Sequence, residues 1–120
     1  MKRLLVLFIV IFVSMIISAQ TITLHCYQSA ARNQNTGYVT PWYSVDFNIS
    51  FDDYTMWVGD ANTYTFSGGI THTSSTQFYV YAYDKDGIRC RVWFQAQASS
   101  RALVGIEYSD IAFTYKTTIR

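Results

Sequence analysis

The sequence predicts an all-β fold, a small antiparallel meander of about eight strands. Two observations predict it. Short segments in which apolar and polar residues alternate recur along the chain, and turn residues separate them about every 8 to 12 positions. No helical periodicity follows the first nineteen residues. Because the connections are short, consecutive strands should pair, which favours an up-and-down barrel of the lipocalin or calycin kind over a sandwich.

Residues 1–19 have the pattern of a secretory signal peptide. Two basic residues, Lys2 and Arg3, precede an apolar run of fourteen residues, and Ser18-Ala19 follows the run. The run is shorter than the about 20 residues of a membrane span. Because Ile17 is not the ideal small residue before the expected cut, an uncleaved anchor stays the alternative. We therefore expect an exported protein, in the periplasm, on the cell surface or in the medium, in which residues 20–120 form a single all-β domain.

The elements of this domain follow from alternation and turn chemistry. The polar stretch Ser29 to Pro41 contains the only proline and is predicted as the longest loop. Gly68-Gly69 is predicted to end a strand. The expected strands are residues 21–28, 42–51, 54–58, 63–67, a weaker 70–75, 77–83, 88–95, 102–108 and 111–117.

Gln77 to Gln97 predicts one long β-hairpin closed by Asp84-Lys85-Asp86-Gly87, where Asp-Gly suits the positive-φ positions of a tight turn. On the second arm the inward face is clear, since the opposite choice would bury two arginines; Ile88, Cys90, Val92 and Phe94 should face the core. On the first arm either face could be buried. We favour the arrangement that buries Phe78, Val80 and Ala82 and exposes the phenol groups of the tyrosines between them.

Cys26 and Cys90 are the only cysteines, and an exported chain could join them in a disulfide. Alternation lets both sulfur atoms face inward. The bridge would close a loop of about 64 residues and stabilise the fold by roughly 4 kcal/mol in the chain-entropy view. Two separate buried thiols, acting as small apolar side chains, are the alternative.

The composition argues against a function in nucleic-acid binding. Without Lys2 and Arg3, seven basic residues stand against eight acidic ones, a net charge of −1. Nucleic acid is therefore a poor candidate partner. Residues 20–120 contain 19 aromatic side chains, which help a small domain to bury enough surface.

Catalytic and metal-binding patterns are weak. The two histidines, His25 and His72, lie in different segments, and no nucleophile-elbow motif is present. Glu107 is the only glutamate and alternates with its neighbours in a way that predicts a solvated strand face. The Asp84 turn lacks the third acidic ligand and distant glutamate of a calcium loop. We expect a protein that is not an enzyme and that uses no metal or cofactor.

Three stretches of strand and turn residues stand out together. They are Met56-Trp57-Val58-Gly59-Asp60 with Thr63-Tyr64-Thr65-Phe66, Tyr83-Asp84-Lys85-Asp86-Gly87-Ile88-Arg89-Cys90, and Ile106-Glu107-Tyr108-Ser109-Asp110-Ile111. With these stretches the chain resembles short exported bacterial β-proteins of unassigned function. The resemblance covers about Phe47 to Lys116 and implies a β fold and export, with no activity to carry over.

Exposed aromatic side chains are the best functional lead. If the first arm buries Phe78, its tyrosines stand in a row outside, beside the polar face of the second arm. Flat aromatic rings next to hydrogen-bonding groups suit a sugar ring or a protein partner, although such pairs also stabilise a sheet without any ligand. The candidate ligand-binding residues are Tyr79, Tyr81, Tyr83, Arg89, Arg91 and Trp93.

The leading hypothesis is therefore a non-catalytic exported module that binds a glycan or a protein surface through these residues. A second is an exported inhibitor or accessory subunit that blocks a partner protein through the Ser29–Pro41 loop or an edge. A third is a barrel that holds a small apolar ligand inside, although the many large aromatic side chains predict a filled interior.

Overall fold

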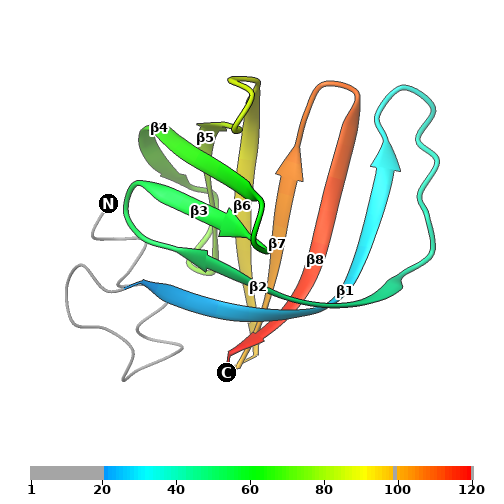
Figure 1. Cartoon of the computed structure of the whole chain (residues 1–120), viewed down its shortest axis with the longest axis horizontal. Helices are drawn as coiled ribbons and strands as arrows, with labels where there is room; N and C mark the ends of the chain where they lie inside the picture. The colour runs from blue at the N-terminus through cyan, green and yellow to red at the C-terminus, as the bar shows by residue number, and fades with distance from the viewer. Residues whose placement is uncertain (1–20, 99, 120) are drawn as a thin grey trace.

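The computed structural model describes residues 21–98 and 100–119, and over these residues the chain is all β (Figure 1). Within them, eight antiparallel strands form a closed barrel in which each strand pairs with the next and β8 pairs with β1. The predicted all-β barrel is thus confirmed. The strands are β1 (Ile22–Asn33), β2 (Tyr43–Phe51), β3 (Thr55–Val58), β4 (Asn62–His72), β5 (Gln77–Tyr83), β6 (Arg89–Ala98), β7 (Arg101–Glu107) and β8 (Ile111–Ile119).

The predicted signal peptide, residues 1–19, lies outside the described residues. No helix long and apolar enough to span a membrane occurs in the described ranges. Export stays a prediction from the sequence.

Apolar side chains from all eight strands fill the barrel interior. At its centre the ring centroids of Phe51 and Phe94 lie 4.8 Å apart, and those of Phe94 and Phe78 lie 5.1 Å apart. An eight-stranded barrel has an interior just wide enough for side chains or one small ligand. Here aromatic rings occupy it, as the aromatic content predicted.

Strand β5 buries the face that the sequence analysis favoured. Phe78, Val80 and Ala82 are almost fully inaccessible to solvent, whereas Tyr81 and Tyr83 are exposed. The reason is the pairing with β6, which sets Phe78 opposite Phe94 and Val80 opposite Val92 inside the barrel. The tyrosines therefore lie on the outer surface.

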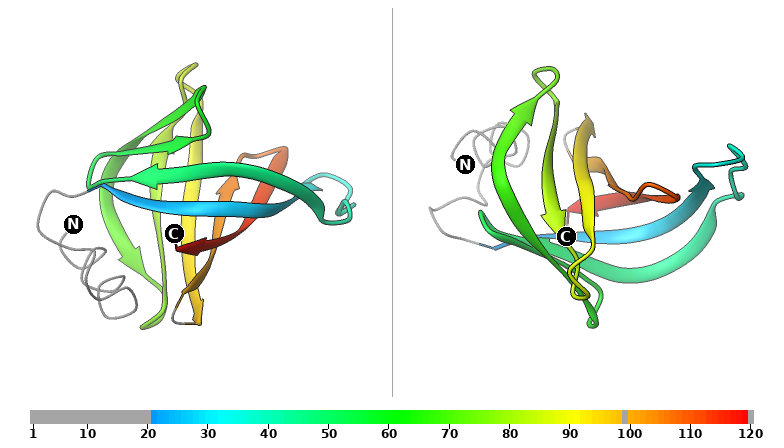
Figure 2. Two further views of the ribbon diagram at one scale, coloured as in Figure 1. Left: turned by 60° about the horizontal axis from the view of Figure 1, so that its bottom comes forward. Right: turned by 90° about the horizontal axis from the view of Figure 1, so that it is seen from above.

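The prediction of a loop from Ser29 to Pro41 is wrong at its start, because β1 continues to Asn33. Beyond Cys26 a β-bulge shifts the register, and β1 stays paired with β8 as far as Asn33 opposite Ile111. After a turn the chain returns along β1, with Val39 bridging Arg32. Residues 29–43 form an arm that projects beyond the barrel (Figure 2).

The prediction that Gly68-Gly69 ends a strand is also wrong. β4 is continuous from Asn62 to His72, and the register with β5 shifts between Ser67 and Thr71. Gly68 has φ +81°, a conformation that L side chains rarely adopt, so glycine permits a bulge here rather than a break.

The turn between β5 and β6 forms as predicted, except at Ile88. Asp84 Oδ1 accepts hydrogen bonds from the N–H groups of Asp86 and Ile88, both at 2.9 Å, and Gly87 takes φ +80°. Ile88 belongs to this turn and is 55% exposed, so the prediction that it faces the core is wrong. The inward face of β6 begins at Cys90.

The predicted disulfide between Cys26 and Cys90 is also wrong, because both cysteines are free and buried. A disulfide needs Cα atoms within about 7 Å, which suits adjacent strands about 4.8 Å apart. Two further strands separate β1 from β6 on the shorter way round the barrel. Both thiols instead pack as small apolar groups, and burial raises the pKa to about 12 for Cys26 and about 11 for Cys90.

Candidate functional site

The six predicted ligand-binding residues lie together on the outer face of β5 and β6. The register pairs Tyr79 with Trp93, Tyr81 with Arg91, and Tyr83 with Arg89. Since these pairs alternate with the buried pairs, all of them point away from the barrel interior. We call this set, Tyr79, Tyr81, Tyr83, Arg89, Arg91 and Trp93, the aromatic face.

Within the aromatic face, arginines already cover two tyrosine rings. The Arg89 guanidinium carbon lies 4.2 Å from the Tyr81 ring centroid, and that of Arg91 lies 5.1 Å from the Tyr79 centroid. The Tyr79 and Tyr81 rings also meet edge to face at 5.8 Å. These cation–π contacts each contribute about 0.5–1 kcal/mol at an exposed site and leave less free ring surface for stacking with a ligand.

Trp93 differs from the tyrosines because it leans across the sheet onto β7. Gly105 lies opposite it, and a Cβ built on Gly105 would come within 1.9 Å of the indole ring. Only a residue without a side chain lets the ring lie this close to the backbone. Trp93 thus belongs to a second feature of the surface, centred on β7, β8 and β1.

That feature is an open groove of about 200 Å³ on the outer face. Pairing places Trp93, Gly105, Thr114 and Ala30 in one row across β6, β7, β8 and β1. Trp93 lies over Gly105, and because Thr114 and Ala30, the next two residues of this row, are small, the surface is hollow beside the indole. We call it the tryptophan groove; its lining is Ala30, Ala31, Arg32, Val39, Trp42, Trp93, Glu107, Ala112 and Thr114.

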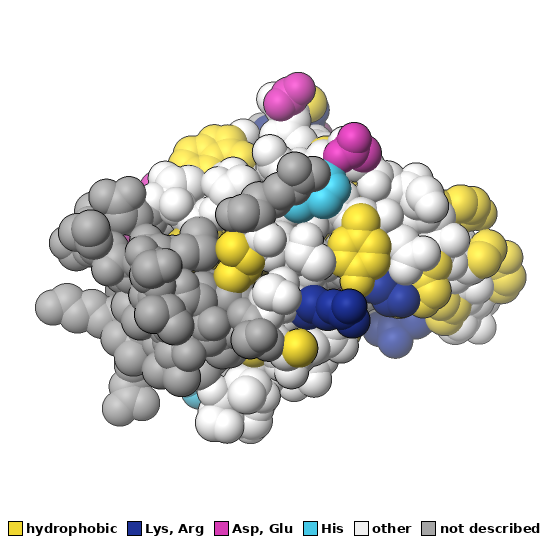
Figure 3. Space-filling view, turned by 90° about the horizontal axis from the view of Figure 1, so that it is seen from below, with side chains coloured by type: hydrophobic (Ala, Val, Ile, Leu, Met, Phe, Trp, Pro, Cys, Tyr) yellow, Lys and Arg dark blue, Asp and Glu magenta, His cyan; other side chains and the backbone are white. Residues whose placement is uncertain are grey.

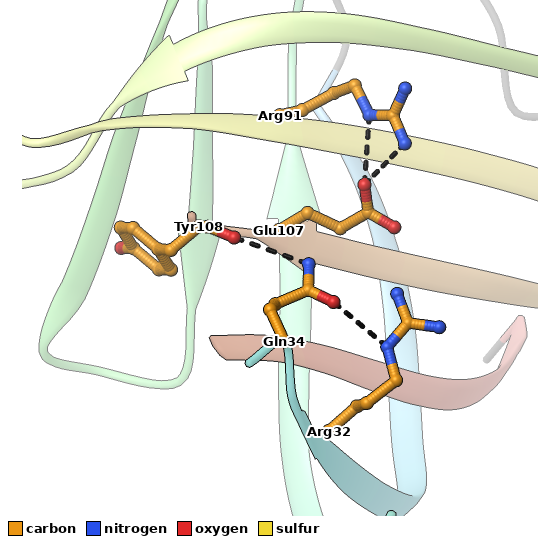
Figure 4. A network of polar contacts seen from close by, with 5 residues as sticks. All are labelled: Arg32, Gln34, Arg91, Glu107 and Tyr108. Carbon is orange, nitrogen blue, oxygen red and sulfur yellow. Dashed lines mark hydrogen bonds and ion pairs between the residues drawn. The ribbon is translucent and has the colours of Figure 1, made fainter. Parts of the chain in front are cut away.

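Charged side chains mark one end of the tryptophan groove. Glu107 forms an ion pair with Arg91, whose Nε donates to Glu107 Oε1 at 3.0 Å. Across the groove Arg32 Nε donates to Gln34 Oε1 at 3.0 Å, and Gln34 Nε2 donates to the Tyr108 carbonyl at 3.3 Å (Figure 4). Both arginines are therefore held by hydrogen bonds beside the groove.

Glu107 lies on the outer strand face, as its alternation predicted, but its side chain is only 20% exposed and is ion-paired with Arg91. The register explains this, since Glu107 stands opposite Arg91 on one side and the small Ala112 on the other. The aromatic face and the tryptophan groove are consequently joined through the Arg91–Glu107 pair.

The arm supplies the far wall of the groove and carries several exposed apolar side chains. Lys116 Nζ lies 4.3 Å from the Trp42 ring centroid, which fixes the indole beside β8. Toward this end of the molecule, Figure 3 shows basic side chains beside exposed hydrophobic ones. The exposed apolar side chains of the arm are Tyr38, Val39, Trp42 and Tyr43.

In the part of the chain that the structure describes, the other titratable groups do not form a comparable site. His25 Nε2 lies 3.3 Å from Asp46 Oδ1, where Asp46 is almost fully exposed. The Tyr108 hydroxyl donates to Asp84 Oδ2 at 2.8 Å, and desolvation raises the pKa of Tyr108. No cluster of three or more metal-ligating side chains occurs among residues 21–98 and 100–119.

Of the groove lining, the sequence pointed to Trp93 alone as a ligand-binding residue. Trp42 was predicted to begin a strand, whereas β2 begins at Tyr43, and Ala30, Gly105 and Thr114 carried no functional signal. Gly105 inside an apolar strand was the available sign, since such a glycine often marks the close approach of another group. Comparisons with protein-family models, curated proteins and solved structures found no match to this chain.

Proposed function

We propose that this protein is an exported, non-catalytic binding module whose ligand, a glycan or a protein surface, occupies the outer face of β5 to β8. Export rests on the signal-peptide pattern of residues 1–19. The observation that carries the binding proposal is the continuity of the aromatic face with the tryptophan groove through Arg91 and Glu107. Tyr, Trp and Arg gathered beside a hollow are the side chains most enriched at binding hot spots.

A paired binding screen tests the proposal. The purified protein is applied to a glycan array and used for pull-down from an extracellular protein mixture, beside the variant Tyr79→Ser/Tyr81→Ser/Tyr83→Ser. We expect at least one ligand whose binding weakens ten-fold or more in the variant, because the arginines lose the rings on which they lie.

Tyr54→Ser is the matched control. Tyr54 is 73% exposed and lies outside the outer face of β5 to β8, so its loss should leave binding unchanged. Circular dichroism confirms that each variant is folded. Ligand binding that survives the triple substitution, or absence of any ligand on both assays, would contradict the proposal.

A second function, an inhibitor or accessory subunit of a partner protein, is favoured by the arm. Tyr38 is 65% exposed and Tyr43 57% exposed on a hairpin that projects from the barrel. Apolar side chains grouped on a protruding element are typical of protein-binding surfaces. Under this function the variant Tyr38→Ser/Tyr43→Ser should lose a captured protein that the tyrosine triple variant retains.

A further inference from the structure

We infer that the tryptophan groove binds a single neutral pyranose ring of an oligosaccharide; this inference rests on the proposed binding function and names the ligand and subsite. Three properties carry it: a floor of small residues, walls of indole rings, and one end that offers both a hydrogen-bond acceptor and donors.

The floor has room for a flat ring. Thr114 and Ala30 lie opposite each other on β8 and β1, and Ala112 lies in the next row, between Glu107 and Arg32. None of these side chains rises far from the sheet. The volume of about 200 Å³ is below the about 300–1,000 Å³ of sites for drug-sized ligands, which limits the occupant to one ring.

The walls offer aromatic surface of the right polarity. Trp93 lies against Gly105, and Trp42 lines the groove from the arm. The face of an indole ring carries partial negative charge, and it attracts the partially positive C–H groups that line one face of a pyranose. A sugar ring can therefore stack on an indole while its hydroxyl groups point along the groove.

The charged end complements hydroxyl groups. Both Arg91 bonds end on Glu107 Oε1, and within the described part of the chain Oε2 accepts no hydrogen bond. An ionised carboxylate is an acceptor only, so Oε2 can take a sugar O–H. Arg32 uses Nε for Gln34 and retains its two Nη groups as donors at the same end of the groove as Glu107, on the other side of Ala112 (Figure 4).

Hydroxyl groups fit both charged side chains at this end of the groove. A hydroxyl group donates to Glu107 and accepts from Arg32, whereas a carboxylate cannot donate to Glu107 and an ammonium group cannot accept from Arg32. Thr114 adds a hydroxyl group on the floor that can do either. The hydroxyl groups of a neutral pyranose can therefore bond to all three side chains.

The test is a titration of the purified protein with oligosaccharides. Arrayed neutral oligomers of glucose, galactose, mannose, xylose and N-acetylglucosamine are screened beside uronate oligomers, and the best neutral binder is measured by calorimetry. We expect Trp42→Ala and Glu107→Gln each to weaken its binding at least ten-fold. Trp57→Ala is the matched control, because Trp57 is as exposed as Trp42, at 37% against 41%, and lies outside the groove on β3; its affinity should stay unchanged.

Several results would overturn the inference. No neutral oligosaccharide bound at millimolar concentration, a preference for uronate oligomers, or affinity insensitive to both Trp42→Ala and Glu107→Gln would each do so. The proposed function is judged separately. A ligand lost in the Tyr79, Tyr81 and Tyr83 triple variant but kept by Trp42→Ala supports binding at the aromatic face and rejects the sugar subsite in the groove. Circular dichroism and urea unfolding establish that Glu107→Gln is folded before its affinity is compared.

Discussion

At the scale of single residues, Gly105 controls how Trp93 lies on the surface. Its missing side chain is the space that the indole occupies, and any Cβ there would overlap the ring. The position of Trp93, which forms one wall of the groove, therefore depends on the missing Cβ atom of Gly105 on the neighbouring strand β7. A substitution of the glycine therefore tests the packing directly.

Gly105→Ala should lower the free energy of unfolding by about 1–3 kcal/mol, because the added methyl group must displace a ring packed against the sheet. Gly69→Ala is the control: no atom lies within 4 Å of its built Cβ and its φ is not positive, so the change should stay within about 0.5 kcal/mol. Urea unfolding of the two variants measures both. Equal stabilities would show that Trp93 does not rest on Gly105.

The two cysteines give a second prediction at this scale. Desolvation by burial raises the pKa of Cys26 to about 12 and that of Cys90 to about 11, so neither thiolate forms at pH 8. Iodoacetamide should label neither cysteine in the folded protein and both in urea, by intact mass. If the denatured protein is labelled only after reduction, Cys26 and Cys90 form a disulfide and this prediction is wrong.

At the scale of elements, the β5–β6 turn is organised by one carboxylate. Asp84 accepts from the Ile88 N–H, and also from the Asp86 N–H and the Tyr108 hydroxyl. The bond from Ile88 contributes most to lowering the pKa of Asp84 below its ordinary value of 3.8. The ionised Asp84 side chain thereby links the turn to Tyr108, which directly follows the C-terminal end of β7.

This pKa predicts the sign of a pH effect. Because the folded pKa is below the unfolded one, the Asp84 contribution to stability is fully present above about pH 5 and is lost as pH falls through the folded pKa. Asp84→Asn keeps an acceptor for the turn but removes the titration, so its stability should fall less than that of the wild type between pH 5 and pH 2. Thermal unfolding across this range checks it.

Asp86→Asn is the control for that series. Asp86 sits in the same turn, but among the described residues its carboxylate accepts no hydrogen bond. Its acid dependence should follow the wild type. If Asp84→Asn and the wild type lose stability in parallel, the ionised Asp84 does not hold the turn.

At the scale of the whole molecule, one set of packed rings couples the two sides of the barrel. Phe94 of β6 contacts Phe78 of β5 and, across the interior, Phe51 of β2. Strands that are distant in the sheet are thus joined at the centre. Loss of the middle ring should affect the whole barrel and not one hairpin.

Phe94→Ala should lower the free energy of unfolding by about 3–5 kcal/mol, since it removes a fully buried ring and leaves a cavity. Ile88→Ala, at a site that the sequence wrongly assigned to the core, should change it by less than about 0.5 kcal/mol. Chemical unfolding followed by tryptophan fluorescence compares them. A small effect at Phe94 would mean that the interior tolerates a void and could take a ligand.

Much of the barrel could be predicted from local pattern. Alternation in β5 and β6 indicated the hairpin, its turn and its outward aromatic face, because side chains of a strand point to opposite sides at every step. The same rule failed where the register slips. Alternation alone would place Ala30 on the same inward face of β1 as Cys26. The bulge after Cys26 instead turns Ala30 outward, opposite Thr114.

The sequence by itself thus determined the fold class, the central hairpin and the residues of the aromatic face. Only the tertiary structure decided that β8 closes onto β1, that the cysteines lie on separate walls, and that Trp42 and Trp93 flank one groove. The physical reason is the separation along the sequence over which each kind of interaction acts. Alternation and turn chemistry act between residues a few positions apart, whereas the groove joins side chains from four strands whose proximity depends on the closure and register of the whole sheet.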